Sequence, residues 1–475
     1  MEPQRLYIGG AWRETGRVAS IINPYTGKPA GHVHLGGDEE MRAAIDAACA
    51  ARPALSGLSN ASRATALDRA RASIKTRREE IARVLTMESG KPIRDSRLEV
   101  DRAAHTFQIA AEEARRFGSG ETIPLDRVEA SAGRMGITRR FGSGVVGAIT
   151  PFNFPINLVA HKVASALACG NPVVLKPAHQ TPLTAFLLAE IIHGTGLPAG
   201  SFNVVHAEPA TGELLASDER IAVLSFTGSG RVGWDLKARA NRKKVILELG
   251  GNAAVIVDAS ADPAEAARRC AAGAFGYAGQ VCISVQRILV HEDLADRFLS
   301  ALLGAVKALQ MGDPLSDSTD IGPMISEQAT ARTEEWVREA IDAGGELLAG
   351  GGPADGRFYP PTVLADVPAA CRVEAEEAFA PIVTVARFTD FDAALDRVNA
   401  SVFGLQAGVF TGDLEHAQRA FLRLEVGAVI INDVPTYRVD HMPYGGVKES
   451  GFGREGVRYA MDEMSDLRLM VLKME

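Results

Sequence analysis

A cysteine in a glycine-rich segment is the residue best suited to chemistry in this chain. Cys282 ends the run Gly279-Gln280-Val281-Cys282, between an alanine-rich stretch of helical spacing (263–273) and a strand-like apolar run (285–291). A thiolate held at such a helix-to-strand junction could act as a nucleophile. The more common role of a free cysteine is that of a small core residue, so other parts of the chain must decide between the two.

A glycine-rich turn elsewhere indicates a phosphate-binding site. The run 228–233 has the pattern G-x-G-x-x-G, follows an apolar strand (222–227) and precedes a helical segment (232–240). Amide groups at the start of a helix can face a pyrophosphate, which predicts a dinucleotide cofactor. Residues 142–147 match the same pattern but open into a strand, which indicates a structural turn.

One acidic residue fits two roles. An acid about twenty residues beyond the first glycine of such a turn is expected to bind a ribose, and Glu248 occupies that position. Glu248 also ends a strand beside Gly250-Gly251, where a catalytic carboxylate is equally suitable. Spacing alone leaves both roles open.

The composition describes a large globular protein. Its 475 residues exceed one ordinary core, so two or three domains are expected. The net charge of −8 argues against general binding to nucleic acid or a membrane surface, and no apolar run is long enough to span a bilayer. The five cysteines are odd in number, scattered and without zinc-site spacing, which predicts reduced thiols, a cytoplasmic location and no metal site.

Alternating strands and helices predict an α/β fold. Short strands (5–35) precede long amphipathic helices at 38–51, 61–89 and 94–116. Strand-like runs then alternate with helices, which indicates a parallel sheet; these runs are 145–150, 172–176, 201–206, 222–227 and 245–248. A second α/β series spans 253–432. The polar segment 121–140 predicts a hairpin that leaves the main body, and the strand 467–473 is its candidate partner, within the chain or across a subunit boundary.

Four stretches, taken together, resemble the aldehyde dehydrogenase superfamily. They are Pro151-Phe152-Asn153-Phe154-Pro155, Glu248-Leu249-Gly250-Gly251, Gly279-Gln280-Val281-Cys282 and Glu377-Ala378-Phe379-Ala380-Pro381-Ile382. Their order and spacing carry the resemblance, which extends from the Asn23-Pro24 turn to the motif 443–451. It implies an enzyme that oxidises an aldehyde to its carboxylic acid with NAD+ or NADP+.

The resemblance also implies a fold and an assembly. The expected fold is α/β, with two Rossmann-like parallel-sheet domains and a β-hairpin oligomerisation arm. The dinucleotide-binding domain would comprise 1–117 and 141–247, the catalytic domain 248–445, and the arm 118–140 with 455–475. A homodimer or homotetramer is expected, with a small aldehyde as substrate and neither nucleic acid nor membrane as partner.

The catalytic roles follow from the same resemblance. Cys282 would attack the aldehyde carbon, Asn153 and the backbone N–H of Cys282 would stabilise the oxyanion, and hydride transfer would leave a thioester. Glu248 would activate the water that hydrolyses it. Lys162 resembles a lysine that assists proton movement near the nicotinamide, although a lysine that extends its amine to the surface is an alternative.

The expected cofactor contacts are spread over several motifs. They comprise Thr150, Pro151, Phe152, Lys176, His179, Gly228, Ser229, Gly233, Leu249, Glu377 and Phe379. Lys176 and Glu377 resemble the residues that hold the two riboses, and Ser229 lies at the pyrophosphate. Family members that prefer NAD+ often carry glutamate where this chain has His179. Because histidine does not repel a 2′-phosphate, both NADP+ and NAD+ are expected; a solvent-facing loop histidine is the alternative.

The expected substrate contacts include three basic side chains. The set is Arg102, Phe154, His161, Val281, Ile283 and Arg438. Basic residues at similar places line the substrate entrance of relatives that act on anionic aldehydes, and paired arginines can bind such a group. A small anionic or hydroxylated aldehyde is therefore expected, of the phosphonoacetaldehyde, lactaldehyde, succinate semialdehyde or glyceraldehyde-3-phosphate type. Phosphate-handling relatives often have arginine at the position of Val281, which weakens this inference.

Other interpretations compete with these. Arg102 could be a surface charge, and Arg438 a structural ion pair with Asp440. A CoA-acylating semialdehyde dehydrogenase would typically lack the acid Glu248. A hydrolase that uses Cys282, Asn153 and His161 would leave the cofactor motifs unexplained, and a non-catalytic structural relative would not need both Cys282 and Glu248.

Overall fold

An eight-stranded sheet organises one half of the molecule in the computed structural model, which describes residues 2–352 and 356–474. Its order is β2-β1-β9-β8-β7-β10-β11-β21, and the five strands from β9 to β11 run parallel. The strands are β1 Leu6–Ile8, β2 Ala11–Arg13, β7 Val145–Ile149, β8 Val173–Lys176, β9 Phe202–Val204, β10 Ile221–Thr227, β11 Lys244–Glu248 and β21 Gly451–Phe452. The predicted strands between 145 and 248 are all present within a few residues.

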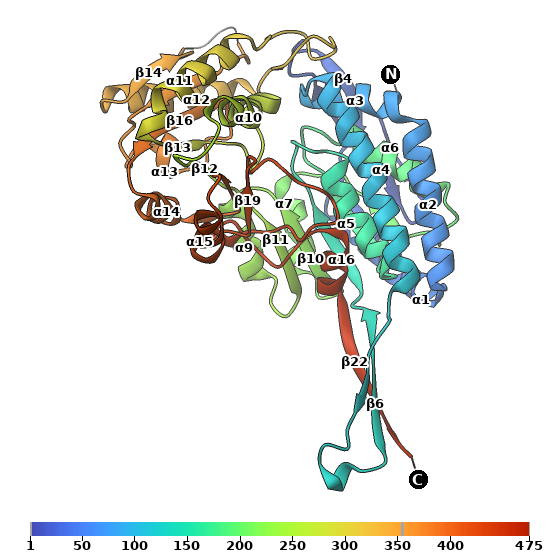
Figure 1. Cartoon of the computed structure of the whole chain (residues 1–475). Helices are drawn as coiled ribbons and strands as arrows, with labels where there is room; N and C mark the ends of the chain where they lie inside the picture. Colours follow the sequence, from blue (N-terminus) through green and yellow to red (C-terminus); the bar gives the residue numbers. More distant parts are fainter. Residues whose placement is uncertain (1, 353–355, 475) are drawn as a thin grey trace.

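Helices cover this sheet, and in Figure 1 all of them except the red α16 are coloured from blue to yellow-green. They are α1 Asp38–Gly57, α2 Asn60–Thr76, α3 Arg78–Ser89, α4 Ile93–Arg116, α5 Asn157–Ala168, α6 Leu183–His193, α7 Pro209–Gly212, α8 Leu214–Ser217, α9 Gly230–Arg239 and α16 Val457–Glu463. The single helix predicted over 61–89 is wrong, because the chain breaks at Arg77 (φ −94°, ψ 16°) into α2 and α3. No glycine or proline in the sequence marks that break. Instead, α3 turns away from α2 to pack against α4 and α6.

A seven-stranded sheet carries the second half of the chain, in the order β14-β15-β16-β13-β12-β18-β19. All its neighbouring pairs are parallel except β14 with β15. The strands are β12 Ala254–Val257, β13 Arg287–His291, β14 Glu346–Ala349, β15 Thr362–Ala365, β16 Ile382–Phe388, β18 Gln406–Phe410 and β19 Ala428–Ile431. The covering helices are α10 Pro263–Phe275, α11 Glu292–Lys307, α12 Glu327–Asp342, α13 Arg372–Ala375, α14 Phe391–Asn399 and α15 Leu414–Arg423. This confirms the second predicted α/β series.

A three-stranded arm projects from the body, with the C-terminal strand along it (Figure 1). It consists of β5 Thr122–Pro124, β6 Arg134–Gly142 and β22 Ser465–Lys473. β22 pairs antiparallel with β6 along its whole length, from Ser465 opposite Gly142 to Lys473 opposite Arg134. The predicted partnership between 467–473 and the 121–140 excursion is therefore made within one chain.

The remaining elements are short. They are β3 Val18–Ile22, β4 Pro29–His34, β17 Phe403–Gly404, β20 Val447–Lys448, η1 Glu129–Ser131 and η2 Gly276–Gly279. Within 2–352 and 356–474, no helix is long and apolar enough to cross a bilayer. The domain limits 1–117, 141–247 and 248–445 stay predictions, and strand β21 shows that residues beyond 445 return to the first sheet.

Candidate active site

The carboxyl ends of the parallel strands in the first sheet gather the predicted polar residues at one edge. Asn153 follows β7, Lys176 ends β8, Ser229 follows β10 and Glu248 ends β11. Parallel neighbours end on the same side, so four residues far apart in sequence face one region. Ligands of open α/β sheets bind outside such strand ends.

A left-handed turn delivers Cys282 to this edge. Tyr277 (φ 49°), Ala278 (φ 52°) and Gly279 (φ 68°) are three successive residues with positive φ between α10 and β13. A Cβ at position 279 would collide with the carbonyl oxygen of Ala380. Glycine is therefore required there, and the chain reverses tightly enough to place the thiol opposite Asn153.

Two cavities meet at Cys282. The first, of about 270 Å3, is lined by Lys91, Asp95, Leu98, Glu99, Arg102, Phe154, Asn157, Leu158, Ala272, Gly273, Gly276, Tyr277, Val281, Cys282, Ile283, Thr436, Arg438 and Tyr444. The second, of about 320 Å3, is lined by Pro151, Phe152, Asn153, Leu158, Thr227, Gly228, Ser229, Leu249, Gly250, Gln280, Cys282, Ile325, Ala329, Arg332, Glu377 and Phe379. Most predicted substrate residues line the first and most predicted cofactor residues line the second, so the thiol can react with molecules that arrive from both sides.

Within the part of the chain that the structure describes, the thiol of Cys282 has one hydrogen-bond partner, the hydroxyl of Tyr444, at 3.2 Å. Burial raises the pKa of Cys282 to about 11, while the Tyr444 hydroxyl and the charge of Arg438 act to lower it. The charges of Glu377 and Glu248 act in the same direction as burial. The reactive thiolate is therefore a minor species at neutral pH, and its amount depends on these neighbours.

Asn153 is fully buried and faces the cysteine loop. Its Nδ2 donates to the carbonyl of Gln280 at 3.0 Å, and its Oδ1 has no partner among the described residues. A carboxamide carries two N–H groups, so one remains for an oxygen held near Cys282. This geometry suits an oxyanion donor.

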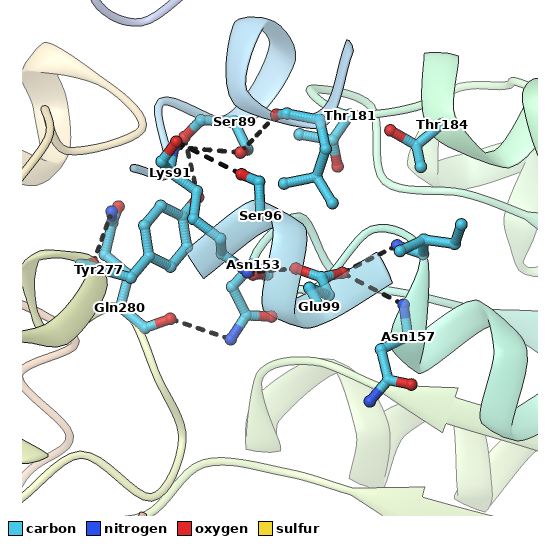
Figure 2. Close-up of polar contacts among 12 residues, drawn as sticks. Ser89, Lys91, Ser96, Glu99, Asn153, Asn157, Thr181, Thr184, Tyr277 and Gln280 are labelled. Carbon is cyan, nitrogen blue, oxygen red and sulfur yellow. Dashed lines mark hydrogen bonds and ion pairs between the residues drawn. The ribbon is translucent and has the colours of Figure 1, made fainter. Parts of the chain in front are cut away.

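A buried ion pair fixes the segment that carries Asn153 (Figure 2). Lys91 and Glu99 form the pair, and both side chains are 1% exposed. Lys91 Nζ also donates to the carbonyl of Asn153 at 2.6 Å and lies 3.7 Å from the centroid of the Phe154 ring. Glu99 accepts from the backbone N–H of Ile156 at 3.0 Å, at the start of α5, where no side chain of α5 itself forms a cap. Residues on α4 and just before it therefore position the candidate oxyanion donor.

Glu248 is buried without any hydrogen bond to its carboxylate among the described residues. Burial, and next the charge of Glu455, raise its pKa well above the usual value, whereas Arg438 and Lys162 act to lower it. A carboxylate in this state binds a proton more readily than an exposed one, as a general base requires.

Lys162 does not extend to the surface, so the alternative of a surface-seeking lysine is wrong. Its Nζ is fully buried, 2.8 Å from Glu455 and 3.0 Å from the Ser225 hydroxyl. Although burial of Glu455 opposes ionisation, the charges of Lys162 and Arg438 lower its pKa to about 2. Glu455 is therefore ionised, and its charge acts on Glu248.

The basic side chains predicted for the substrate divide into two groups. Arg438 lies on the wall of the first cavity, 7% exposed, 3.2 Å from Glu455 and 3.5 Å from the centroid of the Tyr444 ring. Its Nε has no partner among the described residues. Its ion-pair partner is Glu455, so the alternative of a pair with Asp440 is wrong.

Asp440 instead joins the other two predicted residues. Arg102, on the wall of the first cavity, lies 2.7 Å from Asp440 and is 30% exposed. His161 Nε2 lies 2.9 Å from the same carboxylate. The imidazole of His161 is fully buried and is absent from the residues that line the first cavity. Burial lowers the pKa of His161, so it is neutral and positions Asp440 rather than carrying charge to a substrate.

The second cavity has the close approaches that a dinucleotide requires. A Cβ at position 233 would collide with Leu249, and one at position 250 with Glu377. Phe379 adopts a positive φ of 49° and packs edge-on against Phe152, with ring centroids 5.8 Å apart. Burial raises the pKa of Glu377 to about 7, although the N–H of Gly251 opposes this shift. The residues present fit NAD(P)+, because the carboxylate of Glu377 can accept hydrogen bonds from ribose hydroxyls.

Four predicted cofactor residues do not line that cavity: Gly233, which packs behind Leu249, and Thr150, Lys176 and His179. Thr150 is buried, and its N–H donates to the carbonyl of Lys176 at 3.3 Å. Burial lowers the pKa of Lys176 to about 8. His179 stacks on His206, with ring centroids 5.0 Å apart, and its Nδ1 has no partner among the described residues. His179 is partly exposed in a loop beside this second imidazole, so its role at the cofactor stays a prediction.

Comparison with known proteins decides the family. A profile described as the aldehyde dehydrogenase family matches residues 12–470. The chain belongs to the aldehyde dehydrogenase family. It is an oxidoreductase that acts on aldehydes and uses NAD(P)+, with the aldehyde dehydrogenase fold. The CoA-acylating alternative is not favoured.

Three relatives represent the similarity. The chain is 44% identical over 471 residues to a 3-sulfolactaldehyde dehydrogenase of Priestia aryabhattai, covering 99% of this aldehyde dehydrogenase and 98% of the relative. Aldehyde dehydrogenase 21 of Physcomitrella patens, solved with the reaction product succinate, has a TM-score of 0.97 and 45% identity over 100% and 99% of the two chains. The glyceraldehyde-3-phosphate dehydrogenase GapN of Methanocaldococcus jannaschii, solved with NADP, has a TM-score of 0.93 and 38% identity over 97% and 100%.

Sequence reasoning missed several residues of this aldehyde dehydrogenase site. Lys91 lies between Gly90 and Pro92, where the sequence indicates only a turn between two helices. Tyr444 lies in the motif 443–451, but no local signal connects it with a thiol 162 positions earlier. Glu455 and Asp440 carry no spacing signal at all.

Proposed function

We propose that this enzyme oxidises small anionic aldehydes to carboxylic acids through a thioester on Cys282. The thiolate attacks the carbonyl carbon, an S–C bond forms, and the π electron pair moves to oxygen. The free N–H of Asn153 and the backbone N–H of Cys282 bind that oxyanion. When bound, NAD(P)+ supplies the hydride acceptor that this oxidation needs.

Glu248 completes the reaction. It accepts a proton from water while the water oxygen attacks the thioester carbon, the S–C bond then breaks, and the sulfur leaves as thiolate. The support for this role is the buried, unpartnered carboxylate with its raised pKa. The contact between Lys162 and Glu455, both of which act on Glu248 through their charges, forms the proposed route for the proton.

The observation that supports an anionic substrate is the buried guanidinium of Arg438. It lies on the wall of the cavity that contains Cys282, and its Nε is free to donate. Arg102 lines the same cavity, while His161 acts behind it through Asp440. Two relatives fit the same chemistry, because one is named for a sulfonated aldehyde and the other holds a dicarboxylate product.

A matched pair of aldehydes tests this proposal. Succinate semialdehyde and butanal share a four-carbon chain but differ in the terminal carboxylate. A charge-assisted hydrogen bond contributes about 1.5–3 kcal/mol, so kcat/KM should favour the anion by roughly 10- to 150-fold. Arg438→Met should remove this preference and also lower kcat/KM for both aldehydes, because Arg438 acts on the Cys282 thiolate as well; the ratio of the two kcat/KM values is therefore the readout. Arg94→Met, which removes an exposed arginine at the start of α4, should leave the ratio unchanged. Equal kcat/KM values for the two aldehydes in the wild-type enzyme would sink the proposal. The kcat/KM values of aldehydes that carry a sulfonate, phosphonate or phosphate group then show which anion is preferred.

We also propose that the arm joins copies of this chain into a homodimer or homotetramer in the cytoplasm. Apolar side chains of the arm strand β22 are about half exposed, and those of α15 more so; they are Leu467, Leu469, Met470, Val471, Leu414, Phe421 and Leu422. The five free thiols suit a reducing compartment. Light scattering should give a multiple of 50.4 kDa, and a triple variant with aspartate at 467, 469 and 471 should give the monomer mass. A monomeric wild-type enzyme would contradict the assembly.

A further inference from the structure

The hydroxyl of Tyr444 is in direct contact with the nucleophilic sulfur. Tyr444 is 3% exposed, and its Oη lies 3.2 Å from Cys282 Sγ, within the range for a hydrogen bond to sulfur. No other hydrogen bond to this Sγ is formed among the described residues. The contact lies where the first cavity meets the thiol, because both residues line that cavity.

A cation above the ring strengthens this donor. The guanidinium carbon of Arg438 lies 3.5 Å from the centroid of the Tyr444 ring, a close cation–π contact. A positive charge over a phenol withdraws electron density from the oxygen, so the O–H group becomes a better donor. Burial raises the pKa of Tyr444 well above its usual value, which keeps the proton on the hydroxyl.

We propose that Tyr444 is a further catalytic residue, whose hydroxyl donates a hydrogen bond to the Cys282 thiolate and so maintains the reactive form. This inference rests on the proposed role of Cys282 as nucleophile. The Cys282 thiol releases its proton to solvent, and the sulfur then accepts the Tyr444 O–H. When the sulfur attacks the carbonyl carbon, its charge passes to the substrate oxygen and the Tyr444 bond weakens, so the donor serves the free thiolate and not the thioester.

The other charges around the sulfur make this donor necessary. Arg438 favours the thiolate, whereas burial and the carboxylates of Glu248 and Glu377 oppose it. Among residues 2–352 and 356–474, only Tyr444 combines a direct contact with the sulfur and a proton that it can donate. A hydrogen bond to a charged group changes a pKa by roughly one unit or more, which is a tenfold change in the ratio of thiolate to thiol.

Alkylation by iodoacetamide tests the proposal without substrate or cofactor. Modification of Cys282 is followed by mass spectrometry of its peptide, after pH-jump mixing from pH 6 to above pH 11 so that alkaline exposure lasts seconds. For Tyr444→Phe the midpoint should rise by about one unit. Because a more basic thiolate is also more nucleophilic, the net rate at pH 8 should fall only roughly threefold, and the two curves should cross at high pH. Tyr437→Phe, which removes a half-exposed hydroxyl from the neighbouring loop, should leave the curve unchanged.

A second variant keeps the shape of the cavity and changes only the donor. Difluorotyrosine incorporated at position 444 has a more acidic hydroxyl, so alkylation at pH 8 should be faster than in the wild-type enzyme and the midpoint lower. An unchanged midpoint in Tyr444→Phe, or no difference at pH 8 between tyrosine and difluorotyrosine, would overturn the proposal. These outcomes are separate from the role of Cys282, which is tested by loss of turnover in Cys282→Ala.

Discussion

Replacement of the buried Lys91 by methionine should damage stability and catalysis by different amounts. The Lys91 and Glu99 side chains are each 1% exposed and ion-paired, so Lys91→Met leaves the Glu99 charge buried without its partner. Methionine has nearly the same length, so the change creates little empty space. Removal of one member of a buried pair typically costs about 3–5 kcal/mol.

This free energy corresponds to a measurable shift in melting temperature. The unfolding entropy of about 2.1 cal/mol/K per residue amounts to roughly 1 kcal/mol/K for a cooperative unit of 475 residues. Lys91→Met should therefore lower Tm by about 3–5 °C. The double variant Lys91→Met/Glu99→Gln contains no unpaired charge, and its glutamine oxygen can still accept from the N–H groups of Ile156 and Asn157. Most of the lost Tm should return in the double variant.

Activity should not return with stability. Neither variant restores the 2.6 Å hydrogen bond from Lys91 to the carbonyl of Asn153, so the oxyanion donor stays less well fixed. Loss of an entire oxyanion donor costs about 100- to 1000-fold in kcat, and loss of its support should cost on the order of 10-fold with little change in KM.

Calorimetry and steady-state kinetics on the same samples check this reasoning. Lys237→Met is the matched control, because Lys237 also lies over aromatic rings, 4.2 Å from that of Phe452 and 5.3 Å from that of Trp234, but has no carboxylate partner among the described residues. It should change neither Tm nor kcat appreciably. A Tm loss in Lys91→Met below about 1 °C, or a double variant that is no more stable than the single one, would show that the pair does not act as a buried charge pair.

Three further predictions concern the reaction and its cofactor. Glu248→Gln should keep the burst of NAD(P)H but slow steady-state turnover by about 100- to 10000-fold, because only deacylation needs the base. Stopped-flow absorbance measures both phases, and loss of the burst itself would refute the assignment. Because burial raises the pKa of Glu377 to about 7, its carboxylate ionises as pH rises from about 6 to 8, so the KM for NAD(P)+ should fall over that range in the wild-type enzyme and stay flat in Glu377→Gln. His179→Glu should lower kcat/KM for NADP+ about 10-fold or more while sparing NAD+, because a carboxylate there repels a 2′-phosphate. Steady-state kinetics with each cofactor test this, with His193→Glu as a control outside the expected cofactor set. An equal fall in kcat/KM for NADP+ and for NAD+ in His179→Glu would contradict the prediction.

Local patterns in the sequence predicted most of the elements and the residues that could react. The helix predicted over 94–116 and the strand runs before Asn153, Ser229 and Glu248 are set by short-range apolar periodicity and by turn residues. The glycine-rich turn before Cys282 also has a local cause, because the positive φ of 68° at position 279 favours glycine. These features could be predicted because the physical cause of each lies within a few residues.

Tertiary packing decided everything that depends on distant residues. Lys91 meets Asn153 across 62 positions, Cys282 meets Tyr444 across 162, and Lys162 meets Glu455 across 293. A one-dimensional pattern does not encode which buried donor will find which acceptor, since that depends on how helices and sheets pack. For the same reason the break at Arg77 and the partners of Arg438 and Asp440 were not predictable. The sequence thus determined which residues can react and on which elements they lie, whereas the packed structure determined the protonation and orientation in which they meet.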